Sequence, residues 1–162
     1  MMQNKNAPSV KEGNTLPLAN VLVVDDLESD IELTRILLIQ HDKLQCNLLV
    51  AYNADQALRI LQTSAENGNG IDLMLLDINM PGMDGFELME ALRKYRALRQ
   101  TAVVFCTGSP YQKDERRAEL LCSAGYLVKP PSFDKLKPML GYIDTLRVEP
   151  FQEGNRLLRV NL

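Results

Sequence analysis

From Asn20 onward, short apolar segments alternate with stretches in which apolar residues recur at helical spacing. The first segment, Val21–Val24, is a continuous run of valine and leucine, which is typical of a strand buried on both faces. Strands that alternate with helices form a parallel sheet covered by helices on both sides. The alternation therefore predicts an α/β fold with a doubly wound, five-stranded parallel sheet and five helices.

The bounds of the predicted elements follow from these patterns and from the turn residues between them. The predicted strands are Val21–Val24, Cys46–Ala51, Ile71–Leu76, Thr101–Cys106 and Tyr126–Val128. The predicted helices are Ser29–Gln40, Ala54–Ala65, Phe86–Tyr95, Gln112–Ser123 and Phe133–Leu146. We expect Ser29 or Asp30 to cap the first helix, Asp84 the third and Ser132 the last. Pro138 should bend the last helix or mark a late start.

A chain of 162 residues is long enough for one domain with a single packed core. Residues 1–18 contain few large apolar groups and are broken by proline and glycine, so we expect a flexible leader. Residues 19–146 form the predicted domain. Residues 147–162 are too short for a second domain, but they carry apolar side chains suited to packing on the domain or on a second subunit. These apolar side chains are Leu157, Leu158, Val160 and Leu162.

Charge and cysteine content exclude several classes of partner and compartment. The net charge of −3 and the sequence pI near 5.2 do not favour binding to nucleic acid or to a membrane surface. The longest apolar runs, such as Leu73–Leu76, are far shorter than the ~20 residues that cross a bilayer. The N-terminus has no apolar run typical of a secretion signal. Three cysteines without metal-like spacing indicate a reducing compartment, so we expect a cytoplasmic protein.

Polar residues that carry chemistry stand where four of the predicted strands end. Asp25 and Asp26 follow the first strand, Asp77 the third, Thr107 the fourth and Lys129 the fifth. Ligands of an open parallel sheet bind beyond the carboxyl ends of its strands. Three carboxylates brought together there repel one another and need a divalent cation. A set of oxygen ligands suits Mg²⁺, so the sequence predicts a magnesium site with a lysine beside it.

This ordered set of residues resembles the receiver domains of two-component signalling, and especially the single-domain, CheY-like regulators. The likeness spans roughly residues 20–146 and implies a flavodoxin-like fold with strand order 2-1-3-4-5. A pattern in the first helix, Asp30–Thr34, is further similar to regulators paired with bacterial phytochrome kinases. The motifs that carry the main resemblance are Val21–Asp26, Asp77–Gly85, Thr107-Gly108 and Lys129-Pro130.

The resemblance implies a role for each residue at the strand ends. Asp77 would be the phosphoacceptor, whose carboxylate attacks phosphorus to give an acyl phosphate. Asp25, Asp26 and Asp77, together with the backbone carbonyl of Asn79, would hold Mg²⁺. Lys129 would neutralise charge on the phosphoryl oxygens as a flexible point cation. Positioning and electrostatic stabilisation account for most of the catalysis in such a transfer.

The resemblance also implies how the phosphoryl group would be sensed and lost. Thr107 would donate its hydroxyl to a phosphoryl oxygen and move toward it, and Tyr126 would rotate into the vacated space. The face made by the fourth helix, fifth strand and fifth helix would then change. Asn79 and Ser109 stand where this family tunes the lifetime of the phosphoryl group. Both are small and polar, so we expect a short to medium lifetime.

The implied donor is a sensor histidine kinase, with a phytochrome-type kinase as a candidate. We expect a phosphoacceptor that catalyses only its own phosphorylation and dephosphorylation, and not a turnover enzyme. We further expect no attached output domain, no DNA or membrane partner, and a docking or homodimer role for residues 147–162. An alternative is a phosphorelay intermediate that passes the phosphoryl group to a histidine phosphotransfer protein.

Other classes fit the residues less well. A phosphatase of the haloacid-dehalogenase type needs a second aspartate two residues after its nucleophile, where this chain has Asn79. A flavodoxin-like electron carrier needs a phosphate-binding loop after the first strand, where Asp25 and Asp26 stand. A degenerate receiver that acts only as a binding module would not keep the full acidic set. We interpret His41 as a surface residue and Cys106 as part of the core.

Overall fold

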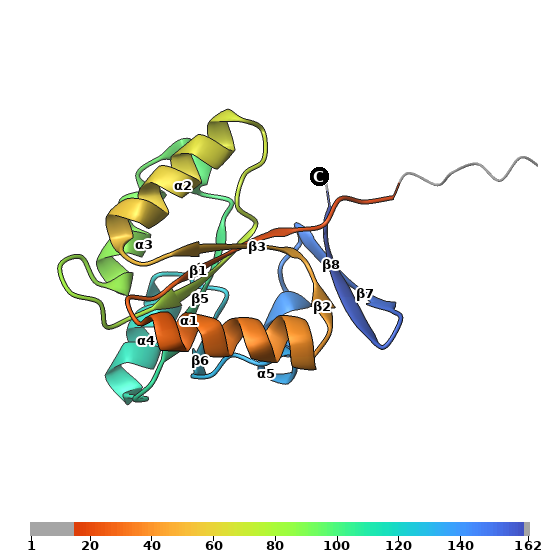
Figure 1. Cartoon of the computed structure of the whole chain (residues 1–162). Coiled ribbons are helices and arrows are strands. Elements are labelled where there is room, and N and C mark those ends of the chain that lie inside the picture. The colour runs from red at the N-terminus through yellow and green to blue at the C-terminus, as the bar shows by residue number, and fades with distance from the viewer. Residues whose placement is uncertain (1–14, 161–162) are drawn as a thin grey trace, which may run out of the picture.

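The computed structural model describes residues 15–160, which form a five-stranded parallel sheet between two layers of helices and a smaller sheet beside it (Figure 1). The order of the large sheet is β3-β1-β4-β5-β6, and every neighbouring pair is parallel. Counted along the chain within this sheet, the order is 2-1-3-4-5, which confirms the predicted fold. Its strands are β1 (Asn20–Val24), β3 (Asn47–Ala51), β4 (Leu73–Asp77), β5 (Ala102–Thr107) and β6 (Gly125–Val128).

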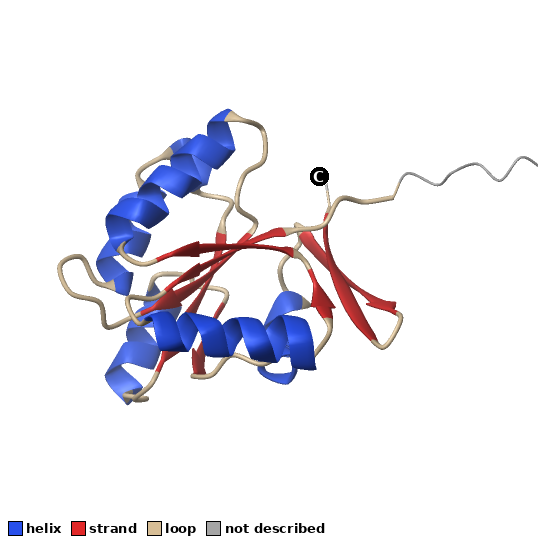
Figure 2. Ribbon diagram, viewed as in Figure 1, coloured by secondary structure: helices blue, strands red, loops and turns tan. Residues whose placement is uncertain are grey.

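Five helices alternate with these strands, as predicted: four connect successive strands and α5 follows β6 (Figure 2). Asp84 and Ser132 cap α3 and α5 by accepting hydrogen bonds from backbone N–H groups of the first turn, at 2.8 and 3.3 Å. The predicted cap of α1 is wrong, because this helix begins at Glu28 and both Ser29 and Asp30 lie inside it. The helices are α1 (Glu28–Arg35), α2 (Ala54–Glu66), α3 (Gly85–Arg93), α4 (Gln112–Leu120) and α5 (Phe133–Leu140).

Two hydrophobic cores lie on opposite faces of the large sheet. One contains side chains of α2, α3 and α4, and here the rings of Phe86 and Phe105 pack with their centroids 4.8 Å apart. The other contains Ile31 of α1, Leu136 of α5 and Val104 of β5. Each fully buried side chain of this size stabilises the fold by about 1.5–3 kcal/mol. Because both faces are covered, all of β4 is buried, including the carboxyl-bearing residue at its end.

The last part of the chain differs from the prediction. The helix predicted over Phe133–Leu146 ends at Leu140. Pro138 has no backbone N–H to donate, and Gly141 directly follows Leu140, the last buried apolar residue of the helix, so the helix is short. Two antiparallel strands follow, β7 (Leu146–Phe151) and β8 (Gly154–Arg159), and β8 also pairs with β2 (Leu44–Gln45). A π-helical segment, η1 (Ile36–His41), precedes β2 and extends α1.

The β7–β8 hairpin packs on its own domain. Leu157 is fully buried in the core shared with α1 and α5, and its carbonyl accepts a hydrogen bond from the Ala19 backbone at 2.9 Å. The Nε atom of Arg159 lies 2.8 Å from Oδ1 of Asp72, at the amino end of β4. The docking or dimer role expected for residues 147–162 stays a prediction.

Two of the predicted segments lie partly outside the described residues. Residues 1–14 of the expected leader and Leu162 of the extension lie outside the described residues. Leu18, the last residue of the expected leader, forms a β-bridge with Leu158. Among residues 15–160, no helix has both the length and the apolar character needed to cross a bilayer.

Candidate metal centre

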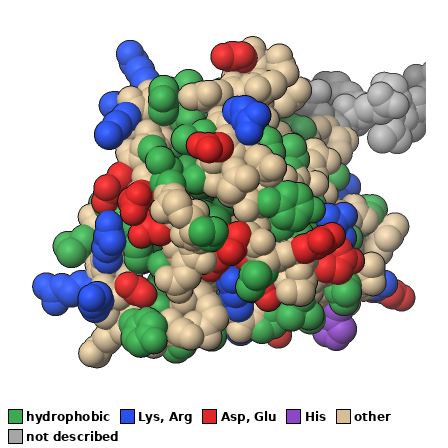
Figure 3. Space-filling model, turned by 60° about the vertical axis from the view of Figure 1, so that its left-hand side comes forward, with side chains coloured by type: hydrophobic (Ala, Val, Ile, Leu, Met, Phe, Trp, Pro, Cys, Tyr) green, Lys and Arg blue, Asp and Glu red, His purple; other side chains and the backbone are tan. Residues whose placement is uncertain are grey.

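Four chemically active side chains meet at the carboxyl edge of the large sheet. Asp25 directly follows β1, Asp77 and Thr107 end β4 and β5, and Lys129 directly follows β6. The strand register brings these positions together, since Asp77 pairs with Cys106 and Thr107 pairs with Val128. On the side of the molecule shown in the space-filling view, acidic and basic side chains lie next to one another near the middle (Figure 3).

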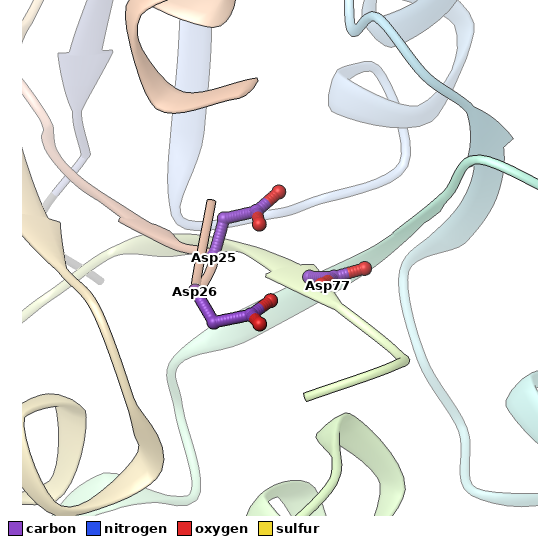
Figure 4. Close-up of side chains that lie close together, drawn as sticks. All are labelled: Asp25, Asp26 and Asp77. Carbon is purple, nitrogen blue, oxygen red and sulfur yellow. The ribbon is translucent and has the colours of Figure 1, made fainter. Parts of the chain in front are cut away.

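The acidic trio of Asp25, Asp26 and Asp77 provides a set of oxygen ligands. One carboxylate oxygen from each residue lies within 4.8 Å of the others, and the three groups point to the same side (Figure 4). Asp25 and Asp77 are 5% and 4% exposed, and Asp26 is half-buried. Buried carboxylates at this separation fit a hard cation that takes a few protein oxygens and completes its shell with water or phosphate oxygens, as Mg²⁺ does.

Lys129 lies between the carboxylates. Its Nζ atom is 2.6 Å from Oδ2 of Asp25, 2.9 Å from Oδ2 of Asp30 and 3.1 Å from Oδ1 of Asp77. Asp30 was not among the predicted site residues. Its position four residues after Asp26, on the first helical turn after β1, is the signal that places it beside the strand ends.

Burial and charge shift the pKa values of the two central groups. Burial, and then the charge of Asp25, raise the pKa of Asp77 to about 6, although Lys129 and a backbone hydrogen bond from Asn79 act in the opposite direction. Burial lowers the pKa of Lys129, but hydrogen bonds to Asp25 and Asp30 and the nearby charges raise it above its ordinary value overall. The lysine therefore keeps its positive charge, whereas Asp77 is ionised less readily than an exposed aspartate.

Comparison with known proteins identifies the family. Residues 21–141 match the family model of the response regulator receiver domain. The chain belongs to this family. It is therefore a receiver domain of two-component signalling. The autoinducer 1 sensor kinase/phosphatase LuxN of Vibrio campbellii is 31% identical over 141 residues, which are 86% of this chain and 15% of LuxN.

Solved receiver structures share the fold. The chemotaxis protein CheY4 of Vibrio cholerae is 25% identical, with a TM-score of 0.64 over 78% of this chain and 98% of CheY4. The bacteriophytochrome response regulator AtBRR is 27% identical, with a TM-score of 0.67 over 78% of this chain and 92% of AtBRR. The predicted likeness to CheY-like receivers is therefore confirmed.

In this receiver domain, Thr107 ends β5 and its side chain contacts the loop that follows. Its hydroxyl is fully buried and donates a hydrogen bond to the carbonyl of Ser109 at 3.0 Å, while the Ser109 backbone N–H donates to it at 3.2 Å. Tyr126 of β6 is half-buried, and its hydroxyl accepts a hydrogen bond from the Tyr111 backbone at 3.3 Å. The two residues expected to switch thus lie on neighbouring strands, and both contact the segment between β5 and α4.

The loop between β4 and α3 is tightly packed against the receiver's phosphoacceptor candidate. A Cβ atom on Gly85 would lie 2.3 Å from the backbone oxygen of Asp77, so only glycine fits there. Asn79 and Ser109 are both exposed, so solvent reaches the two positions at which the lifetime of the phosphoryl group was expected to be tuned.

The structure confirms two further interpretations of single residues. Cys106 is buried in the core, and His41 is exposed on the surface.

Proposed function

We propose that this receiver domain accepts a phosphoryl group on Asp77 in a Mg²⁺-dependent reaction, and that a sensor histidine kinase is the donor. The observation that carries the proposal is the position of Asp77. Its carboxylate lies at the end of a buried strand, within the acidic trio, and 3.1 Å from the ammonium of Lys129. A nucleophile, a set of metal ligands and a cation for the phosphoryl oxygens therefore share one site.

In the proposed transfer, a carboxylate oxygen of Asp77 attacks phosphorus as the bond from phosphorus to the donor's histidine nitrogen breaks. Bound Mg²⁺ would reduce the repulsion between the carboxylate and the phosphoryl oxygens. Lys129 would contact a phosphoryl oxygen, and Thr107 would donate its hydroxyl to another. In the later hydrolysis, water attacks phosphorus, the bond from phosphorus to the Asp77 oxygen breaks, inorganic phosphate leaves and the carboxylate of Asp77 is restored. The protein is regenerated without turning over a separate substrate.

Solvent access supports a short to medium lifetime for the phosphoryl group. Asn79 and Ser109 lie in the loops after β4 and β5, two residues after Asp77 and Thr107, and both are exposed. Small polar side chains at these positions leave room for a water molecule to approach phosphorus. Persistence of the phosphorylated form for days in Mg²⁺ would contradict this part of the proposal.

The output would follow from a population shift. A phosphoryl group adds about two negative charges and several acceptor oxygens. Thr107 would exchange its hydrogen bonds with Ser109 for one to the phosphoryl group, which leaves space for Tyr126 to move inward. The face of α4, β6 and α5 would change with them, and it already exposes Tyr111, Leu120 and Val128. Exposed apolar side chains on such a face suit a protein partner.

The similarity to AtBRR supports a phytochrome-type kinase as the candidate donor. AtBRR is named as a bacteriophytochrome response regulator, and 78% of this chain superimposes on it. Transfer from a phytochrome-type kinase at a higher rate than from an unrelated histidine kinase would support this assignment. Equal rates from both kinases would contradict it.

Intact mass after incubation with acetyl phosphate and Mg²⁺ tests the proposed function. We expect the wild type to gain the mass of one phosphoryl group and Asp77→Asn to gain none. Asp144→Asn, which changes an exposed aspartate, is the matched control and should gain the group as the wild type does. A chelator should prevent the gain. Equal labelling of Asp77→Asn and wild type would exclude Asp77 as the phosphoacceptor.

A further inference from the structure

Lys129 forms ion pairs with two of the three carboxylates of the acidic trio. Its ammonium has three N–H donors, and three carboxylates lie within 3.1 Å of Nζ: those of Asp25, Asp30 and Asp77. Asp25 and Asp77 are also members of the acidic trio. A divalent cation and the lysine therefore compete for the same two carboxylates.

Asp30 differs from the other two partners of Lys129. It is outside the acidic trio, because its oxygens are not part of the group that could hold a metal ion together. Its side chain is 33% exposed, compared with 6% for Asp25 and 5% for Asp77. It comes from α1, whereas Asp25 and Asp26 follow β1 and Asp77 ends β4. Asp30 can therefore hold the ammonium from the solvent side without taking part in metal coordination.

We propose that Asp30 is a positioning residue that retains the Lys129 ammonium when a divalent cation takes Asp25 and Asp77. This inference rests on the proposed function, since it concerns the same site. When a cation enters, the lysine loses its contacts with the trio but keeps its ion pair with Asp30. The lysine then stays within reach of the phosphoryl group, and the cation does not have to displace it into solvent. Asp30 thereby strengthens Mg²⁺ binding through Lys129.

The charges of the site give the direction of the effect. Four carboxylates and one ammonium surround the site, and removal of Asp30 leaves Lys129 with only Asp25 and Asp77 as partners. The lysine then interacts more strongly with the carboxylates of Asp25 and Asp77. The ammonium therefore competes more strongly with the divalent cation for them. Mutation of a residue that orients the ligands of a metal ion commonly lowers the affinity for that ion by about 10–100-fold. Asp30 acts on the cation only through Lys129, and it is partly exposed. We therefore expect removal of its carboxylate to lower the Mg²⁺ affinity by about tenfold, at the lower end of this range.

Calorimetric titration of the full chain with MgCl₂ tests the proposal without any phosphorylation assay. We expect Asp30→Asn to weaken Mg²⁺ binding by about tenfold, and Asp30→Glu to retain most of the affinity because it keeps a carboxylate near Lys129. Glu28→Gln is the matched control, since it removes one charge from the same helical turn at an exposed position. It should bind Mg²⁺ as the wild type does.

A double-mutant cycle with Lys129→Met separates positioning from a simple charge effect. Lys129→Met should tighten Mg²⁺ binding, and adding Asp30→Asn to it should change the affinity by less than about twofold. The same loss from Asp30→Asn with and without Lys129 would overturn the proposal, as would an unchanged affinity in Asp30→Asn alone. Failure of the wild type to bind Mg²⁺ would instead overturn the proposed function. Urea unfolding of each variant in chelator confirms that it is folded.

Discussion

The Nζ atom of Lys129 lies 3.1 Å from Oδ1 of Asp77, yet the pKa of Asp77 is raised to about 6. Burial and the neighbouring charge of Asp25 outweigh the lysine. The lysine is shared with two other carboxylates, so its charge is already partly neutralised. The site without a cation therefore holds more negative charge than its single ammonium balances, and this imbalance favours a divalent cation.

Asp77→Asn should stabilise the metal-free protein at neutral pH. Because the pKa of Asp77 is raised from 3.8 to about 6 on folding, the folded protein binds the proton more tightly than the unfolded chain. The stabilisation contributed by the protonated Asp77 carboxyl is fully present below about pH 4. It is lost as the pH rises through 6, which lowers the free energy of unfolding by up to about 3 kcal/mol. Asparagine is neutral throughout and avoids this loss.

Urea unfolding in chelator, at about pH 7.5 and about pH 4, measures this effect. The free energy of unfolding of Asp77→Asn should exceed that of the wild type at the higher pH and match it at the lower. A difference that is equal at both pH values would show that ionisation of Asp77 is not its cause. Asp144→Asn serves as the control for a general change in charge.

Gly85→Ala should disturb the metal centre as well as the fold. The new Cβ would lie 2.3 Å from the backbone oxygen of Asp77, so α3 or the end of β4 must move. We expect a loss of about 1–3 kcal/mol in stability and weaker Mg²⁺ binding. Gly70→Ala is the matched control, because a Cβ there has no heavy atom within 4 Å. Calorimetric titration with MgCl₂ and urea unfolding provide the two measurements.

Tyr126→Phe should loosen the segment that leads into α4. The Tyr126 hydroxyl accepts the hydrogen bond of the Tyr111 backbone N–H at 3.3 Å, and phenylalanine removes that acceptor while it keeps the ring. A hydrogen bond of this kind contributes about 0.5–1.5 kcal/mol. Hydrogen exchange at the Tyr111 amide should become faster, with little change at amides of β4. An unchanged exchange rate at Tyr111 would show that the contact does not order this segment.

Leu157→Ala should destabilise the whole domain and not only the hairpin. Leu157 is fully buried in the core that contains α1 and α5, so its truncation leaves a cavity between the hairpin and the sheet. We expect a loss of about 2–5 kcal/mol in one cooperative transition. Arg147→Ala, at an exposed position on β7, should cost much less. A separate early transition in Leu157→Ala would show that the hairpin unfolds independently.

Much of the fold was readable from local pattern. Val21–Val24 has no polar residue, which is typical of a strand covered on both faces. Asp84 and Ser132 carry their capping chemistry in the side chain itself. The convergence of Asp25, Asp77, Thr107 and Lys129 also followed from the sequence, because strands of a parallel sheet end at a common edge.

Other features depend on contacts between distant parts of the chain. The hairpin β7–β8 forms where β8 meets β2 and where Arg159 meets Asp72, and neither partner is near it in sequence. Asp30 was predicted, as an alternative to Ser29, to cap the first helix, but it lies inside α1 and contacts Lys129. Lys129 follows β6, which lies on the other side of β4 from β1. Short-range pattern determines which residues form strands and helices, since those propensities are local. Only tertiary packing decides which charged side chains share an ion pair, because that depends on how separate elements are brought together.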